Sequence, residues 1–218
     1  MAQPAVKRPV GNSRERNLRL VPGFGGGSPP PGPRSLRLAN AQIGVLLLIA
    51  SETTMFAGLL AAHFVLRSGS AAWPPPNLPR LPLAITCVNS GMLMLSAFTV
   101  HRALSAARYG RQQGLMAALL ATVVLGMAFV VVQGTEWVRL IRQGLTLSSG
   151  LYGATFYTII GLHAVHVVAA VIWLSLVLRS ARRGRYIASN HVGVWVCAVY
   201  WYFVCVLWLV LVGAIYLN

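Results

Sequence analysis

Acidic residues are almost absent from this chain. Only three of its 218 residues are acidic, and none is an aspartate, against 18 lysines and arginines. Charged residues make up 10% of the chain, whereas soluble globular domains typically contain about 25%. Because 56% of the residues are also hydrophobic, the composition excludes an ordinary soluble domain and predicts a protein that lies in a lipid bilayer.

Cysteine is also scarce. The three cysteines, Cys87, Cys197 and Cys205, all fall inside apolar runs, the last two within the same run. An odd, scattered set gives neither a disulfide framework nor the paired spacing of a metal site. We therefore interpret all three as small buried hydrophobic residues.

The sequence lacks the signatures of a self-sufficient catalyst. It contains no nucleophile with a base nearby, no Gly-rich phosphate loop at a helix start, no acidic metal cluster and no repeat of broken helices typical of transporter cores. We predict no catalytic residue and no metal ligand in this chain. Small helical bundles with so little chemistry are often accessory subunits.

The sequence does contain a series of long apolar runs. Each meets the requirement of about 20 apolar residues for a membrane-spanning helix, and all are too long and continuous for barrel strands. Short polar loops with helix-breaking residues separate them. The predicted fold is an all-α integral membrane protein, a bundle of five transmembrane helices that forms one domain over 38–218. The runs cover roughly 38–66, 81–103, 114–138, 151–178 and 191–217.

The first 37 residues differ in composition from this domain. They are rich in proline and glycine, carry seven lysines and arginines, and contain no apolar run that could serve as a signal peptide. Such a segment cannot bury enough surface to offset its ordering entropy, so we predict that 1–37 is a basic, disordered cytoplasmic tail. A transit peptide is disfavoured because the string GGGSPPPGP would break its amphipathic helix.

The basic residues are unevenly divided between the two ends of the predicted bundle. Fourteen of the eighteen fall in the tail and in the loops after the second and fourth runs. This bias predicts a cytoplasmic N-terminus and a periplasmic C-terminus, with five crossings of the bacterial cytoplasmic (inner) membrane. Anionic lipid headgroups account for these charges, so nucleic acid is not an expected partner.

Three ionisable residues lie within the predicted spans near mid-bilayer. Glu52 is about 14 residues, or roughly 21 Å, along the first helix, and His163 and His166 lie at a similar depth in the fourth. A charged group there costs roughly 2.5–3.5 kcal/mol on insertion scales, so each needs an interior partner or a function. Glu52 has no basic residue within a turn, and must either carry a proton or accept hydrogen bonds in a polar cleft.

The two histidines are three residues apart and share a helix face. Two imidazoles on one helix cannot clamp one haem iron from opposite sides, and the other histidines are poorly placed to complete a haem or metal site. We therefore predict neutral imidazoles that hydrogen-bond to a carboxylate, a hydroxyl or the backbone. These groups meet Glu52 only if the first and fourth helices pack together.

Glu136 and Trp137 stand at the outer end of the third run. The simplest interpretation is an interfacial carboxylate near Arg139 or Arg142, with the tryptophan in the aromatic belt of the bilayer. A functional role for this carboxylate stays open on the sequence alone.

Six strings follow one another along the chain and narrow the interpretation. They are SETTMFAGLLAAHFVLR, WPPP, LPLAITCVNSGMLMLSAFTV, GMAFVVVQGTEW, ATFYTIIGLHAVHVVAAVIWL and YWYFVCVLWLVLVGAIY. In order and loop length they resemble subunit III of the haem-copper terminal oxidases, the cytochrome c oxidase subunit III family, in the five-helix bacterial form that lacks the first two helices of the seven-helix form. The resemblance covers 38–217.

The resemblance implies a non-catalytic subunit of a respiratory oxidase that transfers electrons from cytochrome c or quinol to oxygen and moves protons. Such a subunit packs on subunit I, holds phospholipids, and supports proton uptake, oxygen access and the lifetime of the active centre. No cofactor is expected in this chain, whereas haems and copper are expected in partner subunits, within a complex that could join a respiratory supercomplex. The positions carried over are the intramembrane carboxylate Glu52, the Q-x-x-E-W residues Gln133, Glu136 and Trp137, and the G-x-H-x-x-H residues Gly161, His163 and His166.

The last helix departs from the family pattern. The family usually reads Y-W-H-F-V-D-x-x-W there, whereas Tyr202 stands here for the histidine and Cys205 for the aspartate. The histidine and the carboxylate that the family usually has at these two positions are therefore absent here.

Two alternative functions stay open. An accessory subunit of a nitric oxide reductase would share the fold and differ in its partner. A small membrane haem protein using His163 or His166 would bind its own cofactor, and an optical spectrum of the isolated chain separates it from the accessory subunits.

Overall fold

The computed structural model describes residues 33–75, 82–186 and 191–216, with side chains from residue 40 onward. These residues form helices and no strand. The elements are α1 (Pro33–Ser68), α2 (Leu83–Arg108), α3 (Gln112–Arg142), α4 (Leu151–Arg182), α5 (Val192–Leu211) and the π-helical segment η1 (Val212–Tyr216). Five helices are long and apolar enough to cross a membrane, which confirms the predicted all-α bundle.

The predicted runs and the observed helices differ mainly at their ends. The second, third and fourth helices continue four residues or more past their expected ends, because basic residues in the last turn interact favourably with the helix dipole and are tolerated at the interface. Gly110 and Gly184 follow α2 and α4 with φ of 66° and 68°, the left-handed conformation that ends a helix at low cost in glycine. The predicted tail lies mostly outside the described residues, and α1 already begins at Pro33.

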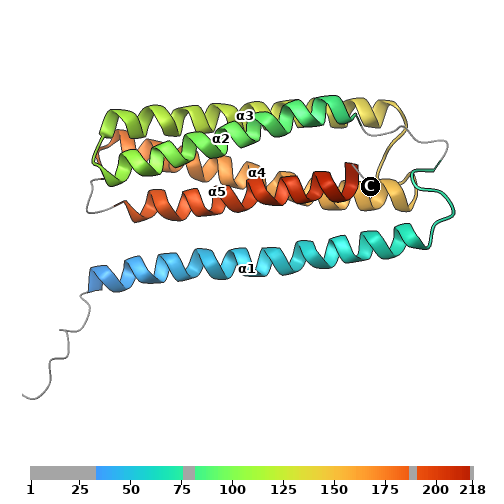
Figure 1. Cartoon of the computed structure of the whole chain (residues 1–218), viewed down its shortest axis with the longest axis horizontal. Coiled ribbons are helices and arrows are strands. Elements are labelled where there is room, and N and C mark those ends of the chain that lie inside the picture. The colour runs from blue at the N-terminus through green and yellow to red at the C-terminus, as the bar shows by residue number, and fades with distance from the viewer. Residues whose placement is uncertain (1–32, 76–81, 187–190, 217–218) are drawn as a thin grey trace, which may run out of the picture.

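Helices α2, α3, α4 and α5 pack together, and α1 lies on one side of them against α4 and α5 (Figure 1). The start of α1, the α2–α3 connection, the end of α4 and the start of α5 lie at one end of the bundle, opposite the end of α5 (Figure 1). Successive helices thus run in opposite directions, as five successive crossings require. Which end faces the cytoplasm stays a prediction.

Helix α5 lies at the centre of the packing. Trp201 and Trp208 are fully buried, and their indole N–H groups donate to the hydroxyls of Ser96 and Ser90 on α2 at 3.0 and 2.9 Å. These bonds satisfy the polar edges of two large rings and hold α5 in register with α2.

Burial of cysteine is confirmed at Cys197 and Cys205 and wrong at Cys87, which is exposed on α2. A membrane helix is apolar on its lipid-facing side as well as inside, so an apolar run does not reveal which face packs against protein.

Candidate functional site

Glu52 lies in a narrow buried stripe on α1. Only four side chains of the described part of this helix are buried, at spacings of seven, four and seven residues, a seam like that of a coiled coil. They are Val45, Glu52, Phe56 and His63. The seam faces α4 and α5, so the carboxylate is held inside the protein, 8% exposed.

Two side chains from other helices contact this carboxylate. The hydroxyl of Tyr200 on α5 donates to both oxygens of Glu52, at 3.1 and 3.2 Å. Nε2 of His166 on α4 lies 3.6 Å from Oε1 of Glu52. The sequence left open whether the first and fourth helices pack together; they do, and this brings Glu52 and His166 side by side. We call Glu52, Tyr200 and His166 the carboxylate cluster.

The contact of Nδ1 determines the tautomer of the neutral His166 ring. Nδ1 is 2.7 Å from the carbonyl oxygen of Leu162, and because a carbonyl only accepts, Nδ1 carries the hydrogen. In the neutral ring Nε2 is then an acceptor that faces the carboxyl group.

His163 points away from this cluster. Its ring stacks on Trp208, with centroids 5.3 Å apart and planes 22° from parallel, and neither ring nitrogen has a hydrogen-bond partner in the described chain. The predicted hydrogen bond is therefore confirmed for His166 and wrong for His163. Positions three apart on a helix differ by about 60° in direction, enough to aim one ring at α1 and the other at α5.

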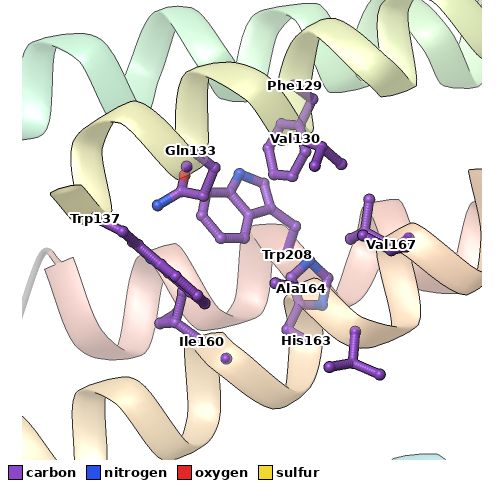
Figure 2. Close-up of a pocket in the computed structure, with 13 residues that line it drawn as sticks. Phe129, Val130, Gln133, Trp137, Ile160, His163, Ala164, Val167 and Trp208 are labelled. Carbon is purple, nitrogen blue, oxygen red and sulfur yellow. The ribbon is translucent and has the colours of Figure 1, made fainter. Parts of the chain in front are cut away.

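A cavity of about 340 Å³ lies between α3 and α4 beside His163 (Figure 2). Its lining is apolar apart from a few groups, and Figure 2 shows Trp208 and His163 side by side with Trp137 nearby. Gly161 of the G-x-H-x-x-H string also lines it, and a Cβ there would lie 3.6 Å from the Trp137 ring. The glycine thus brings α4 close to the indole of α3.

The Q-x-x-E-W residues do not act as one group. The Gln133 side-chain oxygen accepts a bond from Asn89 on α2 at 3.2 Å, which ties α2 to α3. Glu136 accepts from Arg139 at 3.2 Å, the expected interfacial ion pair. Trp137 is partly buried against the core and lines the cavity beside His163.

The two unusual positions of α5 both contact α2. The Cys205 thiol lies 3.9 Å from the carbonyl oxygen of Leu93, and the Tyr202 hydroxyl lies 3.3 Å from Nδ1 of His101. A thiol is a weak donor that fits beside a helix carbonyl, where an aspartate would face that oxygen with a negative charge. Both residues thus have contacts suited to their own chemistry.

The sequence did not identify Tyr200 as a member of the carboxylate cluster. Tyr200 belongs to a run of aromatic residues in the last helix, and such residues in a membrane helix usually serve core packing. The only signal was its hydroxyl, which needs a partner when buried in an apolar helix. The sequence does not reveal which helix supplies that partner.

The described residues contain no group of three or more His, Cys, Asp or Glu side chains that could hold a metal ion. The carboxylate cluster joins one carboxylate, one imidazole and one phenol. A carboxylate, an imidazole and a phenol are groups that can donate or accept a proton.

Comparison with known proteins identifies the family of this chain. The family model for cytochrome c oxidase subunit III matches residues 37–218. Cytochrome c oxidase subunit 3 of Synechocystis is 36% identical over 177 residues, which cover 81% of this chain and 75% of that protein. The probable cytochrome c oxidase subunit 3 of Nocardia farcinica is 32% identical, and the match covers 80% of this chain and 86% of that protein. Cytochrome c oxidase subunit 3 of the mouse is 30% identical, and the match covers 80% of this chain and 68% of that protein. The chain therefore belongs to the cytochrome c oxidase subunit III family, as a multi-pass membrane protein of five helices.

Proposed function

We propose that this chain is the accessory subunit III of a respiratory haem-copper terminal oxidase in a bacterial cytoplasmic membrane. The family match over 37–218 carries the proposal. In this role the chain packs on catalytic subunit I, which holds haem and copper and transfers electrons from cytochrome c or quinol to oxygen. The chain itself supplies structure, bound phospholipid and a proton-holding group, and the complex could join a respiratory supercomplex.

The carboxylate cluster is the part of the chain suited to supporting proton uptake. Glu52 is buried within a helix long enough to span a membrane, where the Tyr200 hydroxyl donates to its carboxylate and Nε2 of His166 lies 3.6 Å from Oε1. Such a group retains a proton without leaving an unpaired charge in a medium where that charge is costly. A proton reservoir beside the catalytic subunit would help to supply that subunit with protons during repeated turnover.

Purification in mild detergent tests the assembly. An affinity-tagged chain should co-purify with a larger subunit that contains both haem and copper. A partner with haem and no copper would assign the chain to a nitric oxide reductase instead, and a chain that purifies alone with its own Soret band would contradict the accessory role.

Replacement of Glu52 tests the role of the cluster. Glu52→Gln keeps the shape and removes the titrating group, so the complex should assemble with unchanged haem content but lose activity sooner during sustained turnover. Glu136→Gln is the matched control, because its carboxylate pairs with Arg139 and lies outside the cluster. Equal activity lifetimes for Glu52→Gln and the wild-type complex would contradict the proposed role.

A further inference from the structure

A second hollow lies between α2 and α3 near the connection that joins them. This groove has a volume of about 450 Å³ and is separate from the carboxylate cluster and from the cavity beside His163. Small side chains form its floor on both helices, namely Ser105, Ala106, Gly114, Ala117, Ala118 and Ala121. We call it the α2–α3 groove.

The mouth of the α2–α3 groove is cationic. Arg102 on α2 and Arg111 before α3 line it and are exposed, together with His101 and Tyr109. The Arg111 guanidinium lies over the Tyr109 ring, 5.5 Å from its centroid, which holds this cation beside the groove.

No carboxylate of the described chain neutralises these two arginines. The chain has only three acidic residues. Glu52 is bound by Tyr200 and Glu136 by Arg139, while Glu15 lies outside the described residues. Two unneutralised guanidinium groups at the rim of a groove favour a ligand that brings its own negative charge.

The position of the groove indicates that this ligand also has a hydrocarbon part. From Arg111 the floor continues along α3 to Ala121, ten residues or roughly 15 Å into a helix that spans the bilayer. The hydroxyl of Thr99 at the inner end bonds to Thr122 at 2.8 Å and to the carbonyl of Ser96, so it adds no unsatisfied polar group to the floor. Alanine and glycine surfaces of this kind accept an acyl chain in van der Waals contact.

We propose that the α2–α3 groove binds one anionic phospholipid, with its phosphate between Arg102 and Arg111 and an acyl chain along the alanines of α3. Arginine matches phosphate oxygens with paired N–H donors, and basic pockets between membrane helices are known to hold anionic headgroups. This site deepens the lipid-binding part of the proposed function and lies away from Glu52. Free phosphate would satisfy the arginines but leave the alanine and glycine part of the floor without a partner.

Lipid retention in nanodiscs tests the proposal on the full chain. The chain is reconstituted into nanodiscs of phosphatidylcholine that contain a minor fraction of phosphatidylglycerol. After the bulk lipid is released, native mass spectrometry counts the lipid molecules that stay bound to the chain. The wild-type chain should retain one phosphatidylglycerol, and Arg102→Gln/Arg111→Gln should bind it roughly 30-fold more weakly, the loss expected for two arginines at a membrane surface. Arg108→Gln is the matched control, because Arg108 precedes the same connection but does not line the groove.

A second variant separates the shape of the groove from its charge. Ala117→Leu keeps both arginines and fills part of the floor, so it should also reduce retention of phosphatidylglycerol. Equal retention by wild type and both groove variants, or displacement of the lipid by inorganic phosphate at millimolar concentration, would overturn the site. Loss of retention when the chain joins its haem-bearing partner would show that protein occupies the groove in the complex, and would also overturn it. Co-purification of that partner is a separate measurement, so failure of this site leaves the proposed subunit role intact.

Discussion

Helices α1 and α5 are both apolar enough to cross a membrane, yet they pack in opposite ways. α5 is buried on most sides, with two fully buried tryptophans anchored to serines of α2. α1 contacts the rest of the protein along one seam, and half of the buried residues in that seam are polar, Glu52 and His63. Figure 1 shows α1 at the edge of the bundle and α5 among the other helices.

The difference shows what can hold a helix in a membrane. Lipid is as apolar as leucine, so burial of apolar surface gives little drive for helix association, and close packing and hydrogen bonds decide it. α5 has both, whereas α1 is held along one seam, by the carboxylate cluster and by the packing of the buried Phe56 ring against His166. The outer face of α1 remains exposed and apolar, with Leu46, Leu47 and Val65 more than half exposed, and it is suited to lipid or a partner helix.

The largest expected effect tests the packing of α5. A Cβ added at Gly126 of α3 would lie 2.7 Å from the Trp201 ring and 3.0 Å from Val171. Because Trp201 is fully buried and bonded to Ser96, it cannot move aside easily, and Gly126→Ala should cost about 1–3 kcal/mol. Unfolding in mixed micelles titrated with sodium dodecyl sulfate measures this free energy.

Gly134→Ala on the same helix is the control, since a Cβ there meets nothing within 4 Å. It should change the free energy of unfolding by less than about 0.5 kcal/mol. Similar losses for both variants would show that α3 does not pack closely on α5 at Gly126.

The next effect tests the attachment of α1. Tyr200→Phe removes the hydroxyl that donates to Glu52 and retains the ring, so it should weaken the α1 interface by about 0.6 kcal/mol and by no more than about 1.7. Hydrogen–deuterium exchange should accelerate in α1 and remain unchanged in α2 and α3. Uniform acceleration over all five helices would mean that α1 does not depend on this bond separately.

A smaller effect is expected at Cys205, where α5 meets α2. Its thiol is a weak donor 3.9 Å from the Leu93 carbonyl, and the tryptophan–serine bonds on either side remain when it is removed. Cys205→Ala should therefore cost less than about 1 kcal/mol in the same micelle titration. A loss as large as that of Gly126→Ala would show that the thiol is a main attachment of α5.

The smallest effect concerns cofactors. Replacement of both His163 and His166 by asparagine should leave the haem and copper content of the purified complex unaltered, because His166 bonds within the protein and His163 stacks on Trp208. Metal analysis and the haem spectrum, normalised to complex, measure this. A stoichiometric loss of haem would assign a ligand role to one of the two rings.

Much of the fold could be predicted because long apolar runs separated by polar loops leave few architectures in a bilayer. Backbone groups must be satisfied within each span, so each run becomes a helix. The positions of Glu52, His163 and His166 at similar depth followed from the rise per residue. The pairing of Glu136 with Arg139 was predictable for the same reason, as the two are three residues apart on one helix.

The sequence by itself therefore determined the number of helices, their approximate spans and the position of each polar group along its helix. Only the tertiary structure decided that Tyr200 completes the cluster, that His163 faces Trp208, that Cys87 is exposed and that a cationic groove opens between α2 and α3. The physical reason is that depth depends on distance along one helix, whereas direction depends on how each helix is rotated against its neighbours. In helices that are apolar on every side, the hydrophobic pattern does not specify that rotation.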